Sequence, residues 1–192
     1  MSNNININFS DNDDTIVAGF EENMILALRR LMRTALAYAD DHPTHVYMYI
    51  QMTKETAFVN FLFKVNGKIV ETNTLNEAKL KGHTFDVSEE RQMELQGYIA
   101  GDMGERLIPL FHANHKKMPS EIYAWIDVSE QFPKCSLIYN FGKKEKENPD
   151  LIETISEWKK QLENPESVGL DSDQFVVVDS LLESLDFVDD EA

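Results

Sequence analysis

The sequence of 192 residues is long enough for one domain, and 42% apolar with 10% aromatic residues is enough to form a core. The formal net charge of −16 argues against nucleic acid and anionic membranes as partners, because phosphate binding requires Lys and Arg. We find no apolar run of about 18 residues, no secretion signal and only one cysteine, Cys135. These features together predict a cytoplasmic protein.

The acidic residues are concentrated at the C-terminal end. From Glu163 onward there are ten acidic residues and no Lys or Arg, whereas the preceding part has twenty-four acidic residues against eighteen basic ones. Such an excess favours long-range attraction to a basic protein partner. An acidic surface without a binding role is the alternative.

The first predicted elements are an arm and a helix. In residues 1–13, apolar residues alternate with polar ones, which is typical of a loose arm or a short edge strand. Asp13 and Asp14 are suited to cap a helix, and the apolar residues that follow have helical spacing. We expect this helix to end near Asp40, because the residue before Pro43 is forced out of the helical region.

Three strands of a meander are predicted next, at Val46–Met52, Ala57–Val65 and Lys68–Thr74. Asn66 and Gly67 form a two-residue hairpin of the type that requires positive φ at both positions. That loop sets the register, which should place Val65 opposite Lys68, Phe63 opposite Val70 and Phe61 opposite Thr72.

A second long helix is predicted within Phe85–Lys117, capped by Ser88 or Asp86, with a kink or an early end before Pro109. Two strands, Glu121–Val128 and Lys134–Phe141, and a third helix that begins at Pro149 and reaches about Glu163 complete the pattern.

The order α-β-β-β-α-β-β-α predicts an α+β fold with a mostly antiparallel five-stranded sheet and helices packed on one face. The expected organisation is an arm at 1–13, a single domain at 14–162 and an acidic C-terminal extension at 163–192. A short amphipathic helix is expected in that extension, with its apolar side formed by Leu181, Leu182, Leu185 and Val188. Whether this side docks on the domain or on a partner is left open.

We expect no enzyme, because local catalytic motifs are missing. Two histidine pairs have ligand-like spacing, His42 with His45 and His112 with His115, but each lacks a third ligand. Cys135 lies in a predicted strand, where a buried inert thiol is expected. We therefore predict no catalytic residue, no cofactor and no metal.

Aromatic residues on two predicted strands suggest a binding surface instead. If the alternate residues face the core, Tyr47, Tyr49, Tyr123 and Trp125 point to the opposite side of the sheet. Tyr and Trp carry much of the binding energy at protein interfaces. A second layer of helix, or the C-terminal tail, covering this face is the alternative.

Two stretches, VYMYIQMTKETAFVNFLFKVNGKIVE after the first helix and PSEIYAWIDVSEQFPKCSLIYNF before the helix with Trp158, resemble the YezG-like immunity proteins, an antitoxin family that includes EsaG. The resemblance covers roughly residues 14 to 162. It implies a small acidic cytoplasmic protein that binds and neutralises a cognate toxin, often a nuclease delivered by a specialised secretion system. The acidic extension after Pro165 departs from the family pattern.

The sequence thus predicts an immunity protein that binds a basic toxin domain through an acidic surface, and an acidic secretion chaperone or adaptor is the alternative. Direct binding of nucleic acid or membrane is not expected, and the oligomeric state stays open. The candidate partner-binding residues combine the C-terminal acids with the aromatic residues: Asp179, Glu183, Asp186, Asp189, Asp190, Glu191, Tyr47, Tyr49, Tyr123 and Trp125.

Overall fold

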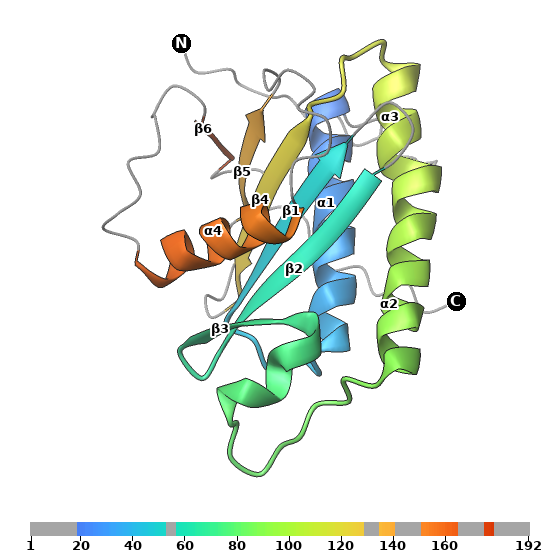
Figure 1. Ribbon diagram of the computed structural model, residues 1–192. Coiled ribbons are helices and arrows are strands. Elements are labelled where there is room, and N and C mark those ends of the chain that lie inside the picture. The colour runs from blue at the N-terminus through green and yellow to red at the C-terminus, as the bar shows by residue number, and fades with distance from the viewer. Residues whose placement is uncertain (1–18, 53–56, 129–134, 141–150, 165–174, 179–192) are drawn as a thin grey trace, which may run out of the picture.

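The computed structural model describes residues 19–52, 57–128, 135–140, 151–164 and 175–178. It shows an α+β fold with an antiparallel sheet in the strand order β3-β2-β1-β4-β5-β6 (Figure 1). The strands are β1 His45–Met52, β2 Ala57–Val65, β3 Lys68–Glu71, β4 Glu121–Asp127, β5 Cys135–Asn140 and β6 Phe175–Val178. The helical segments are α1 Phe20–Tyr38, the 3₁₀ helix η1 Thr72–Ala78, α2 Glu89–Asp102, the π-helical turn η2 Met103–Leu107, α3 Ile108–Ala113 and α4 Leu151–Glu163.

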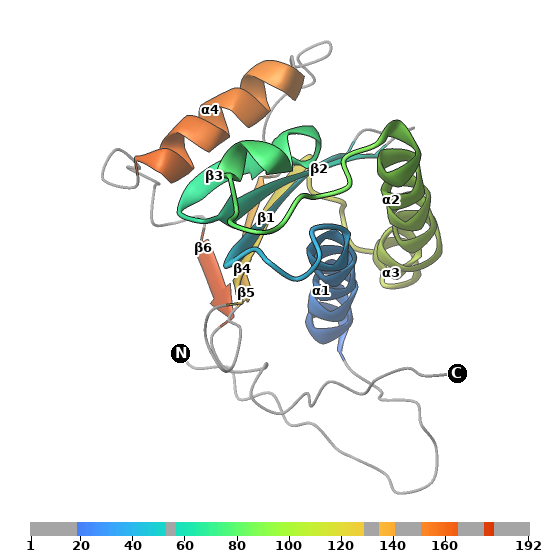
Figure 2. The ribbon, with the colours of Figure 1, turned by 90° about the horizontal axis from the view of Figure 1, so that it is seen from below.

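The predicted sheet of five strands with helices on one face is wrong in two respects. First, the sheet has six strands, because the apolar run at Phe175–Val178 pairs with β5. The sheet therefore extends into the segment that the sequence analysis set apart as an extension. Second, α1, α2 and α3 lie on one face, whereas α4 crosses the other (Figure 2). Both faces of the central strands carry apolar side chains, so each requires a cover.

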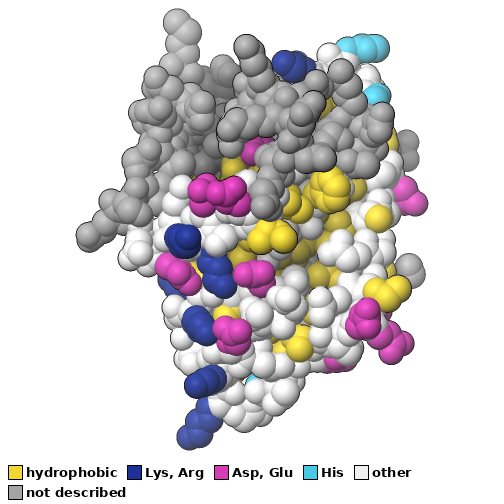
Figure 3. Space-filling model, in the orientation of Figure 1, with side chains coloured by type: hydrophobic (Ala, Val, Ile, Leu, Met, Phe, Trp, Pro, Cys, Tyr) yellow, Lys and Arg dark blue, Asp and Glu magenta, His cyan; other side chains and the backbone are white. Residues whose placement is uncertain are grey.

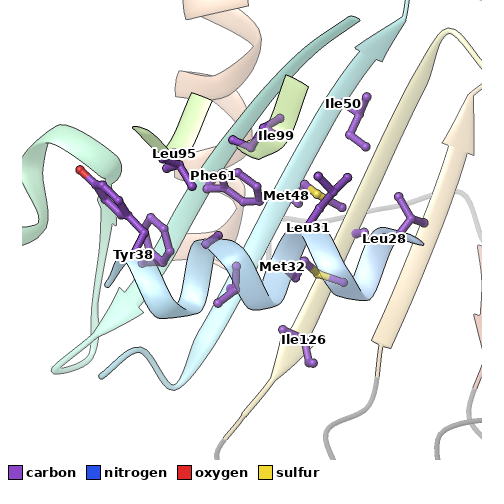
Figure 4. Close-up of a cluster of buried hydrophobic side chains, with 14 of the residues drawn as sticks. Leu28, Leu31, Met32, Tyr38, Met48, Ile50, Phe61, Leu95, Ile99 and Ile126 are labelled. Atoms are coloured by element: carbon purple, nitrogen blue, oxygen red, sulfur yellow. The ribbon is translucent and has the colours of Figure 1, made fainter. Parts of the chain in front are cut away.

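The larger core lies between α1, α2 and the sheet. Leu28, Leu31 and Met32 of α1 are buried against Met48 and Ile50 of β1 (Figure 4). Residues three and four apart on a helix share a face, which explains why α1 buries one continuous apolar stripe. Each such side chain contributes roughly 1.5–3 kcal/mol on full burial.

The hairpin between β2 and β3 forms as predicted at its tip but is shorter. Asn66 and Gly67 have positive φ of 50° and 76°, and Val65 pairs with Lys68. The register ends at Leu62 opposite Glu71, so the predicted strand pair of Phe61 with Thr72 is wrong. The Glu71 amide donates to Thr74 Oγ1 at 3.0 Å, and this local bond accompanies the turn into η1.

Helix α2 ends at Asp102, and helical structure continues past Pro109 through η2 and α3, so the predicted kink or early end before Pro109 takes the form of a π-helical turn. Ser88 caps α2 by accepting a hydrogen bond from the Arg91 amide at 3.3 Å. The π turn η2 then connects α2 to α3, with the Ile108 amide bonded to the Met103 carbonyl. The start of α3 consequently places Pro109 in a first turn, where its missing N–H is tolerated.

Candidate functional site

Helix α4 covers the second face of the sheet through Trp158. The Trp158 ring lies 6.1 Å from the ring of Tyr47, 6.4 Å from that of Tyr49 and 5.2 Å from that of Tyr123. The angles between the planes are 86°, 53° and 74°, respectively, in the range of edge-to-face and tilted aromatic contacts. Ile155 of the same helix is buried beside it. This aromatic layer anchors α4 to the sheet.

A buried hydrogen bond lies within the aromatic layer. The Tyr49 hydroxyl donates to Glu121 Oε1 at 2.9 Å, and Glu121 is only 3% exposed. Burial, followed by the negative charge of Glu121, raises the pKa of Tyr49 and that of Tyr123. Burial and then Asp127 raise the pKa of Tyr47 to about 12. The three hydroxyls therefore stay protonated near neutral pH.

The predicted aromatic residues are thus the inner surface of a two-layered face. Tyr47 and Tyr49 are buried, and Tyr123 and Trp125 are half-buried among the residues packed against α4. The sequence analysis left open that a helix covers this face, and in the structure α4 covers it. The predicted acidic residues lie outside the described part of the chain: Asp179, Glu183, Asp186, Asp189, Asp190 and Glu191.

Within the described residues, carboxylates gather in a groove where α1 ends and α2 begins. This acidic groove, of about 630 Å³, is lined by Asp40, Asp86, Ser88, Glu90, Arg91 and Glu94. It exists because α1 and α2 pack antiparallel. The Arg30 Nε of α1 donates to both carboxylate oxygens of Asp102 at the end of α2, at 3.0 and 3.2 Å, and Arg91 near the start of α2 donates to the Ala37 carbonyl near the end of α1 at 3.5 Å.

One guanidinium and four carboxylates share the acidic groove. Arg91 donates to Glu94 at 2.8 Å and lies over the Tyr38 ring, 5.6 Å from its centroid. Hydrogen bonds from Ser88 lower the pKa of Asp86, which keeps that carboxylate charged. Asp40 pairs with His83 Nε2 at 3.1 Å. The groove therefore presents an excess of negative charge to solvent.

The acidic residues at the end of α1 stand in an unfavourable local setting. Asp40 and Asp41 both have positive φ, 50° and 57°. Left-handed backbone costs roughly 1–2 kcal/mol for ordinary L-residues, although Asp tolerates it better than most. A helix C-terminus also carries partial negative charge, which repels carboxylates. For Asp40, the pair with His83 offsets part of this cost.

The sequence analysis did not identify the acidic groove. It treated Ser88 and Asp86 only as candidate caps of the second helix, at a helix start where the macrodipole favours acids. The signal available was a pair of acids after one helix and a cluster before the next. Only the antiparallel packing of α1 on α2, through long-range contacts, brings the two sets together.

Neither histidine pair is joined by a third potential ligand among the described residues. Instead, the His42 ring lies 4.2 Å from the ring of His83, and His45 Nε2 lies 3.4 Å from Asp127. Among the described residues, no group of three His, Cys, Asp or Glu side chains is placed to hold a metal ion. No helix in the same part of the chain is long and apolar enough to cross a membrane.

The described residues carry little of the net charge. They contain seventeen Asp and Glu against thirteen Lys and Arg, a net charge of −4 out of −16. On the face that includes α4, basic and acidic side chains are interspersed (Figure 3). The remaining −12 resides in the other segments, above all in the residues after Glu163.

No protein-family model matches the chain, and no curated protein shows significant sequence similarity to it. The likeness to YezG-like immunity proteins is therefore a prediction from the residues alone.

Proposed function

We propose that this protein is an immunity protein that binds a basic toxin domain, of the nuclease type, and blocks its activity. The acidic groove at the junction of α1 and α2 is the observation that carries the proposal. A nuclease presents Lys and Arg to hold phosphates, and a carboxylate-lined groove is complementary to that surface.

The distribution of charge supports the same function. The described residues carry a net charge of only −4, so they pack without strong self-repulsion, and the −12 carried by the rest of the chain attracts a basic partner over a long range. The groove then supplies close contacts once the partner has arrived. The tyrosine rings of the aromatic layer pack against Trp158 of α4, and the Tyr49 hydroxyl donates to Glu121, so these side chains have a structural role that fits a binding protein.

The proposal is tested with the purified chain and the product of the neighbouring gene. We expect inhibition of the toxic activity at one-to-one stoichiometry, and an association rate constant that falls steeply as salt rises. Glu90→Lys should slow association several-fold at low salt. Glu105→Lys, the same charge change at an exposed position outside the groove, serves as the matched control.

Two results would contradict the proposal. An association rate that is independent of salt removes the electrostatic mechanism. A saturated complex in which the partner keeps its full activity identifies a chaperone or adaptor rather than an immunity protein.

A further inference from the structure

Strand β2 has an open edge along its first half. It pairs with β1 over its length from Ala57 to Lys64, but on its other side β3 pairs only with Leu62–Val65. Among the described strands, none lies beside residues 57–60 on that side. We call residues 57–60 the open edge.

The register shows which backbone groups the open edge presents. In an antiparallel pair, successive residues direct their N–H and C=O groups to alternate sides. The Lys64 carbonyl accepts from the Thr44 amide on the side of β1, whereas Val65 flanks the two-residue hairpin and bonds to Lys68. Because every second residue of β2 has the same orientation as Val65, the N–H and C=O of Val59 point away from β1, towards the open side. No described residue hydrogen-bonds to them.

A groove continues the line of β3 beyond the point where that strand ends. It has a volume of about 400 Å³ and is lined by Thr72, Glu89, Gln92, Met93, Leu95 and Gln96. Thr72 is the first residue after β3, and the other lining residues belong to α2. None of the lining residues belongs to β2, but a segment on the open edge that continued towards Thr72 would reach this groove.

Exposed apolar side chains flank the open edge. Phe58, within the open edge, is 48% exposed, and Met93, which lines the groove, is 70% exposed. Hydrophobic side chains are visible at the surface in the region of β2, between α4 and α2 (Figure 3). Natural proteins blunt exposed edges with charge or proline, and residues 57–60 contain neither.

From these observations, we propose that the open edge binds an extended segment of a partner protein by β-strand addition. The segment would have alternating apolar residues flanked by Lys or Arg, because Glu89 lines the groove and the chain carries a net charge of −16. Main-chain hydrogen bonds to Val59 would supply affinity, and the groove would select the side chains. The inference does not depend on the acidic groove or on the partner being a toxin.

A second copy of this chain fits the open edge less well. Helix α2 projects past the edge of β2 in both views (Figures 1 and 2). Antiparallel pairing of two β2 edges about a twofold axis keeps both α2 helices on the same face, where they would compete for the same space.

The test selects peptides from a random twelve-residue library on the full chain, with counter-selection on Val59→Pro. Proline removes the outward N–H and is tolerated at strand edges. We expect sequences with alternating β-branched or aromatic residues and flanking Lys or Arg. The best peptide should lose at least tenfold in affinity for Val59→Pro or Phe58→Lys, but less than twofold for Tyr98→Ala, an exposed aromatic position on α2 outside the groove.

Methylation of alternate peptide amides removes the main-chain donors without changing the side chains, and it should abolish binding. Hydrogen exchange gives a readout that folding defects do not mimic: the Val59 amide should exchange rapidly in the free protein and be protected by the peptide. Protection of Val59 in the free monomer would show that another segment of this chain fills the edge. Dimerisation lost in Val59→Pro would show a second copy there. Either result, or a library with no peptide that survives counter-selection, overturns the inference.

Discussion

The aromatic layer predicts that Trp158 is the main anchor of α4. Its side chain is 8% exposed and contacts the rings of Tyr47, Tyr49 and Tyr123. A buried Trp removes about 200 Å² from water, which at about 25 cal/mol per Å² corresponds to about 5 kcal/mol as an upper bound. Alanine keeps part of that area, while the cavity adds a cost. We therefore expect Trp158→Ala to lower the free energy of unfolding by about 3–5 kcal/mol.

Urea unfolding followed by far-ultraviolet circular dichroism measures this loss. Because a domain of this size is stable by only about 5–15 kcal/mol, Trp158→Phe provides a milder variant for which we expect a loss of about 1–2 kcal/mol. Gln161→Ala, an exposed position on α4, should change stability by less than about 0.5 kcal/mol. A loss below about 1 kcal/mol for Trp158→Ala would refute the reasoning, since it would mean that α4 does not shield the tyrosine face.

Three further predictions concern single residues. Gly67→Ala should destabilise the protein by about 1 kcal/mol, because the φ of 76° at this position disfavours a Cβ. Gly97→Ala should stabilise the protein by about 0.5–1 kcal/mol, because Gly97 lies in a helix with open space around it. Thermal unfolding measures both changes. The pKa of Tyr47 is about 12 in the folded protein and near 10 in the unfolded chain. Its contribution to the free energy of unfolding should therefore be complete below pH 10 and fall by about 2–3 kcal/mol as the pH rises to 12, as measured by urea unfolding against pH. Glu121→Leu should cost about 1–3 kcal/mol in chemical unfolding, because it leaves the Tyr49 hydroxyl without its acceptor.

The sequence predicts the parts of the fold that local chemistry specifies. Asn66–Gly67 sets the hairpin register because few other residues accept positive φ at two successive positions. The end of β3 is not specified in this way. Thr72 and Thr74 suit a strand, but the bond from the Glu71 amide to Thr74 Oγ1 belongs to the turn into η1. That shortening leaves the open edge of β2, which no sequence pattern indicates.

The position of α4 shows what periodicity leaves undetermined. Alternation places Tyr47 and Tyr49 away from Met48 and Ile50, but it does not say whether solvent or a helix lies beyond them. Tyrosine suits both, since its ring is apolar and its hydroxyl polar. Trp158 and Ile155 decide the matter through contacts far apart in sequence. The acidic groove has the same origin, because two acid clusters become one site only when α1 packs on α2.

The first turns of α2 separate the two proposed binding surfaces. Glu90 and Glu94, four residues apart, share the face towards α1 and the acidic groove, whereas Met93 and Gln96 share the face towards β2 and the open edge. Gly97 lies between these two faces of α2. Nothing lies within 4 Å of its Cβ position, so the backbone of a partner can approach α2 closely there.

This arrangement lets a double-mutant cycle decide whether one partner occupies both surfaces. The two sites share no side-chain contact among the described residues, so for one rigid partner the binding losses from Glu90→Lys and Val59→Pro should add within about 0.5 kcal/mol. If two different ligands bind, each variant should weaken only its own ligand. A partner that crosses the helix should also be sensitive to Gly97→Trp, which fills the crossing without touching either surface. If Gly97→Trp weakens the binding of only one ligand, the two surfaces bind different ligands.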